Sequence, residues 1–254
     1  MRVRQSCQDK NWQELSNLLC EIFTPAALVN CVADAGLPYG AGSIPKPIPN
    51  PRQKLVLFTE HRDTLSYLEN RIATLLGRSE AVVIIHGSMG REERMKAQES
   101  FRHDPEVQIL LATDAAGEGI NLQRAHLMIN YDLPWNPNRI EQRFGRIHRI
   151  GQDQPVQMYN FCAGGSIEDR ILDILDRKIN MFELVIGEID MILGRLTTEK
   201  EFSDLVFELW LEHTDEAQQA KAFDALGTQL KRARTAYEKS KDLDEKLFQD
   251  DFGT

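Results

Sequence analysis

Four arginines stand close together in the second half of the chain, at Arg139, Arg143, Arg146 and Arg149. Their spacings of four, three and three residues would bring the side chains to one broad face of an α-helix. A guanidinium group stays charged at physiological pH and offers a planar fork of N–H donors that suits phosphate oxygens. The spacing therefore predicts a helix over residues 138–149 whose arginines handle phosphates. The alternative is that they form salt bridges on a solvated helix.

A glycine-rich segment precedes the arginines, with the sequence ATDAAGEGINL at residues 112–122. Gly117 and Gly119 lack a Cβ, so the backbone around them could approach a phosphate closely. Thr113 stands at the expected end of a strand, where its hydroxyl could donate to a nucleic-acid phosphate. A plain strand-to-helix turn also favours glycine, so the two glycines alone leave that alternative open.

Alternating strands and helices are predicted between residues 54 and 162, and they would position both segments. The expected strands are residues 54–59, 81–86, 107–112, 125–131 and 156–162, and the expected helices are residues 63–76, 91–103 and 138–149. The strands are apolar along their length, as is typical of a parallel sheet with helices on both faces. Because such sheets bind ligands at the carboxyl ends of their strands, the expected working edge comprises the loops that begin at Thr59, His86, Thr113 and Asp132.

The segments on either side of this α/β region differ from it. Apolar residues recur at a helical period in residues 9–35, whereas five prolines crowd into residues 36–53 and exclude regular structure there. Past Gly165 the pattern is helical, with a capping box at Ser166 and further helices over residues 199–213 and 215–249. We therefore expect an N-terminal helical segment (1–36), a proline-rich linker (37–53), a parallel-sheet domain (54–165) and an all-helical extension (166–254).

Net charge is distributed unevenly along the 254 residues. The first 160 residues hold equal numbers of basic and acidic side chains, so the whole formal charge of −9 falls in the remainder. An acidic chain is unusual for a nucleic-acid binder, but binding depends on where the charges lie. The arginine cluster therefore keeps nucleic acid among the expected partners.

Cysteine usage and hydropathy narrow the class of protein further. The four cysteines form no CxxC pair and no cluster with histidine, which argues against a zinc site or a disulfide framework and fits a reducing cytoplasm. No apolar run reaches the ~18 residues that a membrane span needs. We also see no signal peptide, and we expect a cytoplasmic, nucleoid-associated protein without a membrane partner.

Four ordered segments resemble the motifs of superfamily-two helicases. LVLFTEHRDT (55–64) resembles motif IV, and IHGSMGREERMKAQESF (85–101) resembles the block after it. The glycine-rich segment resembles motif V, and YDLPWNPN (131–138) followed by QRFGRIHRIGQ (142–152) resembles motif VI. The terminal HRIGQ is the piece most similar to Swi/Snf-type ATPases, in their bacterial branch. The chain thus resembles the C-terminal RecA-like lobe of that family over residues 54–162, and more weakly over 166–195.

The resemblance implies a fold and a role for individual residues. The implied fold is an α/β, RecA-like parallel sheet between helices, without a P-loop of its own. Arg146 and Arg149 would be arginine fingers that reach ATP held on another lobe. The implied ATP-binding residues are Gly117, Gly119, Asn121 and Gln142, and the implied nucleic-acid contacts are Thr59, Gly87, Ser88, Arg91 and Thr113. Glu118 departs from the family pattern, and its carboxylate would repel phosphate unless it points away or pairs with an arginine.

Only half of an ATP site is visible in these residues. They contain no GxxxxGK[ST] loop to hold the β- and γ-phosphates, and no DExx motif to hold magnesium. The expected function is therefore the second motor lobe of an ATP-dependent DNA translocase, with ATP and magnesium shared with a cognate N-terminal lobe. Swi/Snf-type proteins translocate on duplex DNA without separating its strands, so duplex DNA is the expected substrate, with other nucleic acids left open.

Two alternatives to a motor lobe remain open. The chain could be a non-catalytic nucleic-acid-binding module, or a protein-interaction module that works through its acidic helical tail. The sequence also leaves two roles for Trp135: its side chain could pack against a neighbouring lobe, or it could fill the core.

Overall fold

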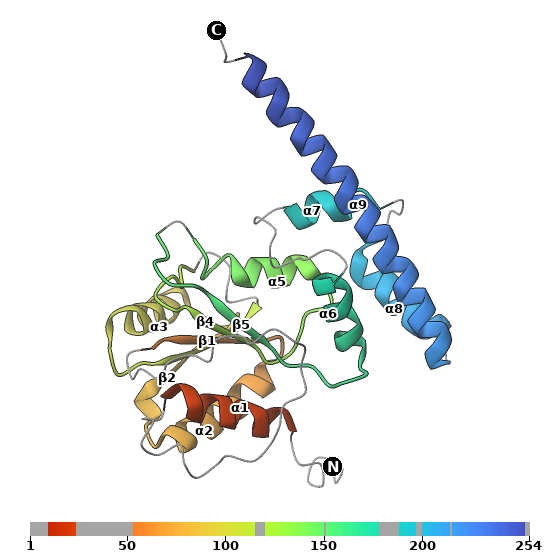
Figure 1. Cartoon of the computed structure of the whole chain (residues 1–254). Coiled ribbons are helices and arrows are strands. Elements are labelled where there is room, and N and C mark those ends of the chain that lie inside the picture. Colours follow the sequence, from red (N-terminus) through yellow and green to blue (C-terminus); the bar gives the residue numbers. More distant parts are fainter. Residues whose placement is uncertain are drawn as a thin grey trace. The chain divides into compact units, whose positions relative to one another are not determined.

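The computed structural model describes residues 10–23, 53–114, 120–149, 151–177, 188–196, 200–213 and 215–251. In these residues, five parallel strands form one sheet in the order β2-β3-β1-β4-β5 (Figure 1). The strands are β1 (Leu55–Thr59), β2 (Val82–Ile85), β3 (Ile109–Thr113), β4 (Leu127–Asn130) and β5 (Gln157–Asn160). The predicted α/β fold with a parallel sheet is therefore confirmed.

The strands are aligned so that their carboxyl ends meet at one edge. Thr59, the last residue of β1, is the register partner of Thr113, the last residue of β3. On the other side of β1, Phe58 is the partner of Asn130 in β4. The pairing continues one residue beyond β4, where the Tyr131 N–H donates to the Phe58 carbonyl at 3.0 Å. The ends of three neighbouring strands thus lie together, as the expected working edge requires.

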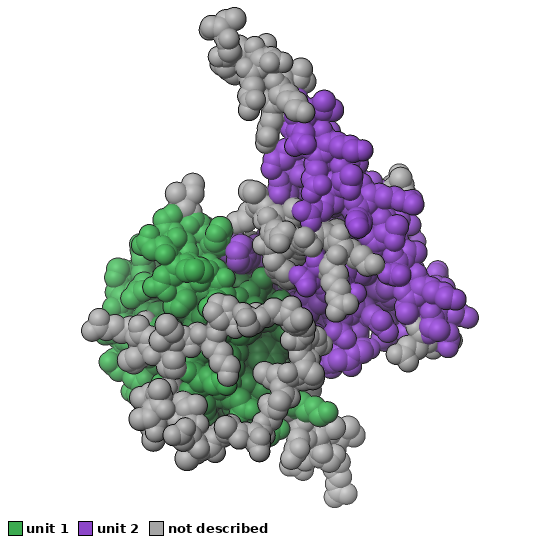
Figure 2. Space-filling model, viewed as in Figure 1, with its two compact units in different colours: residues 1–132, 146–161 green, residues 133–145, 162–254 purple. Residues whose placement is uncertain are grey.

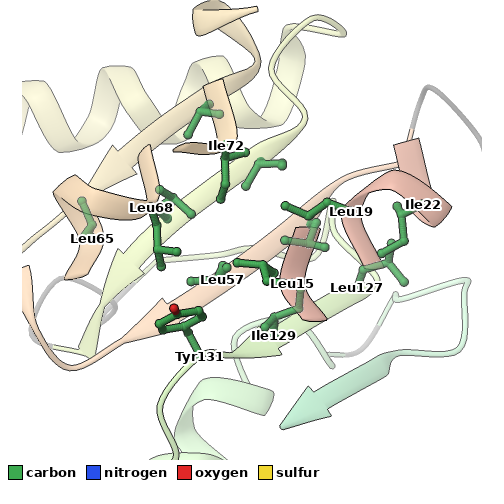
Figure 3. Close-up of a cluster of buried hydrophobic side chains, with 14 residues drawn as sticks. Leu15, Leu19, Ile22, Leu57, Leu65, Leu68, Ile72, Leu127, Ile129 and Tyr131 are labelled. Carbon is green, nitrogen blue, oxygen red and sulfur yellow. The ribbon is translucent and has the colours of Figure 1, made fainter. Parts of the chain in front are cut away.

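Both faces of the three central strands are buried, which explains why β1, β3 and β4 are mostly apolar. The edge strand β5 (QMYN) is only half-buried and mixes polar with apolar residues, unlike the apolar run expected there. Leu55 and Leu57 of β1 join a core cluster with α1 (Lys10–Phe23) and α2 (Arg62–Leu76). Val56 and Phe58 point the other way, into a cluster with α3 (Arg91–His103). Figure 3 shows the first cluster, in which the labelled side chains of α1 lie beside Leu57 of β1 and Leu127 and Ile129 of β4.

Helix α1 is part of the core of the sheet. Its buried residues Leu15, Leu19 and Ile22 recur at a helical spacing and pack in the same cluster as the strands. The helical period predicted for residues 9–35 is thus confirmed as far as Phe23, and residues 24–35 lie outside the described residues. Residues 37–52 of the expected linker also lie outside them.

The helices that connect the first strands begin and end where the sequence indicates. Helix α2 ends at Gly77, whose φ of 66° is a left-handed conformation that favours glycine. The Gly77 and Arg78 N–H groups donate to the Thr74 and Ala73 carbonyls, which satisfies the last turn of the helix. A short 3-10 helix, η3 (Ser79–Ala81), then leads into β2. Helix α3 covers residues 91–103, as predicted.

A buried lysine fixes the connection between α3 and β3. Lys54 is 3% exposed, and its Nζ donates to the carbonyls of Phe101 at 2.5 Å, Asp104 at 2.6 Å and Val107 at 2.8 Å. The ammonium also lies 5.3 Å from the centre of the Phe101 ring. One side chain therefore satisfies three carbonyls where a helix ends and a loop begins.

The chain divides into two compact units, coloured separately in Figure 2. The first comprises residues 1–132 and 146–161, and the second comprises residues 133–145 and 162–254. The second unit contains α5 (Pro137–Phe144), α6 (Ile167–Arg177), α7 (Glu188–Leu193), α8 (Phe202–Glu212) and α9 (Glu216–Asp251). Since α5 contacts α7, residues 133–145 pack with the C-terminal helices, although we expected them in the sheet domain.

Helix α9 is the element against which the other C-terminal helices pack. Helices α6, α7 and α8 each contact it. Four apolar side chains of α9 at a helical spacing are buried there, since Phe223, Leu226, Leu230 and Ala233 are each no more than 6% exposed. Farther along, Glu188 of α7 accepts hydrogen bonds from Tyr237 at 3.1 Å and Lys241 at 2.8 Å. None of the described helices is both long and apolar enough to cross a lipid bilayer.

Candidate functional site

The carboxyl edge of the sheet collects most of the residues expected to contact nucleic acid. Thr59 and Thr113 are neighbours there, since they are register partners at the ends of β1 and β3. Gly87 and Ser88 follow the end of β2, which pairs with β3, and both are exposed. The Ser88 hydroxyl lies 2.9 Å from Nδ1 of His86. Arg91 is also exposed, at the first position of α3.

Thr59 faces the protein interior. Its side chain is fully buried, and its hydroxyl donates to Oδ2 of Asp132 while it accepts a hydrogen bond from the His61 N–H at 3.3 Å. The other carboxylate oxygen of Asp132 accepts from the Glu60 N–H at 2.8 Å. Asp132, to which we gave no site role, therefore ties the loop after β4 to the loop after β1. These contacts give Thr59 an internal role, and a contact of its hydroxyl with nucleic acid stays a prediction.

The glycine-rich segment is described only at its two ends. Gly117 and Gly119, two of the expected ATP-binding residues, lie outside the described residues, as does Glu118. Asn121, a third, is half-buried and shapes a local turn. Its Oδ1 accepts from the Gln123 N–H at 3.0 Å, and its Nδ2 donates to Oε1 of Gln123 at 3.0 Å. The structure thus shows Asn121 supporting the backbone at the C-terminal end of the segment.

The helix predicted over residues 138–149 is wrong in its second half. Helix α5 begins after Asn136, whose side chain accepts from the Asn138 N–H at 2.9 Å, and it ends at Phe144 with Gly145 as its C-cap. Residues 146–149 form a separate turn, which we call the arginine turn. The four arginines therefore do not share one helical face.

Long-range contacts explain why the helix stops. Ile147 is fully buried in the cluster that includes Ile120 and Leu122. The Arg146 carbonyl accepts from the Leu122 N–H at 3.0 Å. The arginine turn is thus fixed against the C-terminal end of the glycine-rich segment, at Ile120 and Leu122. Arg146 is half-buried and Arg149 is exposed on this support.

Gln152, the last residue of HRIGQ, holds the same two segments. Its Nε2 lies 3.0 Å from the Gln123 carbonyl, 2.9 Å from the Ala125 carbonyl and 3.3 Å from the Ile147 carbonyl. We gave Gln152 no role from the sequence, although its place after a glycine in a helicase-like motif was a usable signal.

Positive charge and burial lower the pKa of two basic side chains near these segments. Burial is the main cause for His126, and the neighbouring Arg124 guanidinium lowers the pKa of this imidazole further. Burial also lowers the pKa of Lys54, again with a contribution from Arg124, while Asp104 acts in the opposite direction. His126 is therefore neutral at pH 7, where even its ordinary pKa of 6.5 would leave most imidazoles unprotonated.

Three other candidates lie on α5, in the second unit. Arg139 and Gln142 are exposed, whereas Arg143 is only 2% exposed. Trp135 lies just before this helix, where its Nε1 donates to Oε1 of Glu168 at 3.0 Å and its ring lies 6.0 Å from that of Phe207. Trp135 therefore packs against α6 and α8 within its own unit.

The comparisons with known proteins agree with this arrangement. Residues 46–151 match the family described as the helicase conserved C-terminal domain. An uncharacterized ATP-dependent helicase of Bacillus subtilis (strain 168), YqhH, is 42% identical over 157 residues, which cover 61% of this chain and 27% of the relative. The DNA repair protein RAD5 of Debaryomyces hansenii is 32% identical over 145 residues, which cover 56% of this chain and 12% of the relative.

A solved structure supports the fold. The crystal structure of the C-terminal part of the Fun30 ATPase domain matches 82% of this chain and 56% of that chain, with a TM-score of 0.51 and 21% sequence identity. At that identity the match speaks for the fold alone.

Fold, motifs and comparisons together define the class: the chain contains a helicase conserved C-terminal domain, built as a RecA-like parallel sheet. The relative from Bacillus subtilis that shares this region is named as an ATP-dependent helicase. The matched part of the chain spans 27% and 12% of these two curated relatives.

Proposed function

We propose that this chain acts as the second motor lobe of an ATP-dependent DNA translocase, in which Arg146 and Arg149 stabilise the γ-phosphate of ATP held by another RecA-like lobe. The observation that carries the proposal is the arginine turn, which core packing and hydrogen bonds fix next to the glycine-rich segment. Negative charge on the γ-phosphate oxygens must be stabilised during hydrolysis, and a guanidinium held in place does this without reorganisation.

The rest of the ATP site belongs, in this proposal, to the first lobe. The sequence contains no phosphate-binding loop. Among the described residues, no group of three or more His, Cys, Asp or Glu side chains could hold a metal ion, so we assign none of them to magnesium. This chain would add the backbone at Gly117 and Gly119 and the side chains of Asn121 and Gln142.

Nucleic-acid contacts are proposed at the carboxyl edge of the sheet. Gly87, Ser88 and Arg91 are exposed there, next to the end of β3 where Thr113 stands. Backbone N–H groups, a serine hydroxyl and an arginine are typical partners of phosphate oxygens. Duplex DNA is the proposed substrate because of the resemblance to Swi/Snf-type ATPases, and because a relative is a DNA repair protein. A protein partner for the acidic tail is a further proposal.

Reassembly of the motor tests the function. The chain would be mixed with a cognate RecA-like lobe that carries the phosphate-binding loop, and ATP hydrolysis would be measured with and without duplex DNA. We expect hydrolysis that neither lobe shows alone, and that duplex DNA stimulates. No gain in rate, with both lobes folded, would count against a motor lobe. Salt-dependent DNA binding by the chain alone, without any such gain, would favour the binding module.

A further inference from the structure

The amide of Gln152 is engaged more fully than surface glutamines usually are. An amide NH₂ group has two N–H donors. The Ala125 and Gln123 carbonyls, at 2.9 and 3.0 Å from Nε2, can take both, and the Ile147 carbonyl at 3.3 Å shares one of them. Oε1 accepts from the Gln154 N–H at 3.3 Å, so both ends of the amide have partners.

The backbone before Gln152 allows this placement. Gly151 has a φ of 96°, which L side chains rarely adopt, so a glycine is required to turn the chain here. The Gln152 N–H then donates to the Arg149 carbonyl at 3.0 Å, which closes the turn. The side chain is thereby directed back toward the arginine turn and the segment before β4.

The three acceptors belong to two different segments. The Gln123 and Ala125 carbonyls lie between the glycine-rich segment and β4, whereas the Ile147 carbonyl lies in the arginine turn itself. A backbone hydrogen bond also joins these parts of the chain, from the Leu122 N–H to the Arg146 carbonyl. The amide of Gln152 therefore adds a second polar connection, beside the apolar contact of Ile147 with the core.

We propose that Gln152 is a positioning residue that joins the arginine turn to the exit of the glycine-rich segment, so that Arg146 and Arg149 keep a fixed place relative to that segment. This inference rests on the proposed function, because it assigns Gln152 a part in placing the two arginines. Small displacements of catalytic groups lower turnover strongly, which is why a distant amide would affect hydrolysis.

The test uses three variants of the full chain. Gln152→Ala removes the amide, and Gln152→Glu keeps its shape but replaces the donor with an acceptor that faces carbonyls. Gln154→Ala is the matched control, since Gln154 is exposed and two residues away. In the chain alone, we expect hydrogen exchange of the Leu122 amide to accelerate roughly tenfold or more in both Gln152 variants. The amides of β1 and β3, and the control, should be unchanged.

The second readout separates positioning from general structure. In the reassembled two-lobe motor, both Gln152 variants should lower kcat roughly 10- to 100-fold while KM for ATP changes by less than about threefold. Unchanged exchange at Leu122, or unchanged kcat, in both variants would overturn the inference. Faster exchange throughout β1 and β3 would also overturn it, since that would mean general destabilisation.

The failure of the proposed function would look different. It would appear as unchanged turnover of the motor when Arg146 or Arg149 is replaced. The exchange of Leu122 is measured without ATP or a second lobe, so its result does not depend on that outcome.

Discussion

The hydroxyl of Thr59 is hydrogen-bonded inside the protein both as donor and as acceptor. It donates to Asp132 and accepts from the His61 N–H, and its side chain is fully buried. Thr59→Val keeps the volume but removes both interactions. Because this leaves buried partners without hydrogen bonds, we expect the first unit to lose about 1–3 kcal/mol of unfolding free energy. Exchange of the slowest amides of β1 measures that loss.

Thr59→Ser is the control, since it keeps the hydroxyl and loses only a methyl group. It should retain most of the stability of the unmodified chain. A Thr59→Val variant that is fully stable but binds DNA more weakly would show that the hydroxyl contacts nucleic acid instead.

His126 should make the stability of the first unit depend on pH. Its pKa lies below 6.5 in the folded protein because of burial and Arg124, so below pH 6.5 the unfolded state binds more protons. The free energy of unfolding should therefore be unaffected by His126 above about pH 6.5. It should fall as the pH drops from 6.5 toward the lower pKa that His126 has in the folded protein. His126→Gln should flatten the decline between about pH 7.5 and about pH 5.5. Equal slopes in the two proteins would show that other groups cause the dependence.

At the scale of elements, the arginine segment shows where local sequence patterns stop being sufficient. The spacing of the arginines fits a helix, and α5 does continue through Arg143. The helix then ends because Ile147 is buried in a cluster with residues far away in sequence, and because Leu122 takes the Arg146 carbonyl. Gly145 was the only local sign of a helix end inside the predicted span, and a single glycine does not decide one.

The strands and most helix boundaries could be predicted because their causes are local. Runs of buried apolar residues define the central strands β1, β3 and β4, and Gly77 ends α2 through its own backbone conformation. The partners of Thr59 and Gln152 could not be predicted, since Asp132, Gln123 and Ala125 come near them only through the sheet topology. In the candidate site, residue types and approximate positions were therefore predictable, but hydrogen-bond partners were not.

Replacing Lys54 would show how much the stability of the connection between α3 and β3 depends on one side chain. Lys54→Met keeps an unbranched chain but removes the donor for three carbonyls. We expect the first unit to lose about 2–4 kcal/mol, because buried carbonyls are left without partners. Amide exchange in β3 would measure the loss. Lys96→Met, at an exposed position on α3, is the control and should have little effect; equal losses in the two variants would contradict this account.

At the scale of the whole molecule, the chain forms two compact units, each of which combines two stretches that are not consecutive in the sequence. The helical pattern past residue 165 was visible in the sequence, whereas the burial of Phe223, Leu226, Leu230 and Ala233 on α9 is seen only in the fold. The assignment of residues 133–145 to the helical unit was not visible. It depends on Trp135, which meets Glu168 and Phe207 only in the folded chain. Arg139, Gln142 and Arg143 accordingly belong to a different unit from Arg146 and Arg149.

The central claim is that Arg146 and Arg149 act on ATP held by another lobe. Arg146→Ala and Arg149→Ala would each be combined with the first lobe and duplex DNA, and ATP affinity and single-turnover hydrolysis would be measured separately. Arg102→Ala, at an exposed position in the last turn of α3, is the control and should leave both unchanged.

We expect each replacement to slow hydrolysis roughly 10³-fold or more while ATP affinity changes little, since an arginine finger acts mainly on the transition state. Unchanged hydrolysis in both variants, or a large loss of ATP affinity with normal turnover, would contradict the role assigned to the arginine turn.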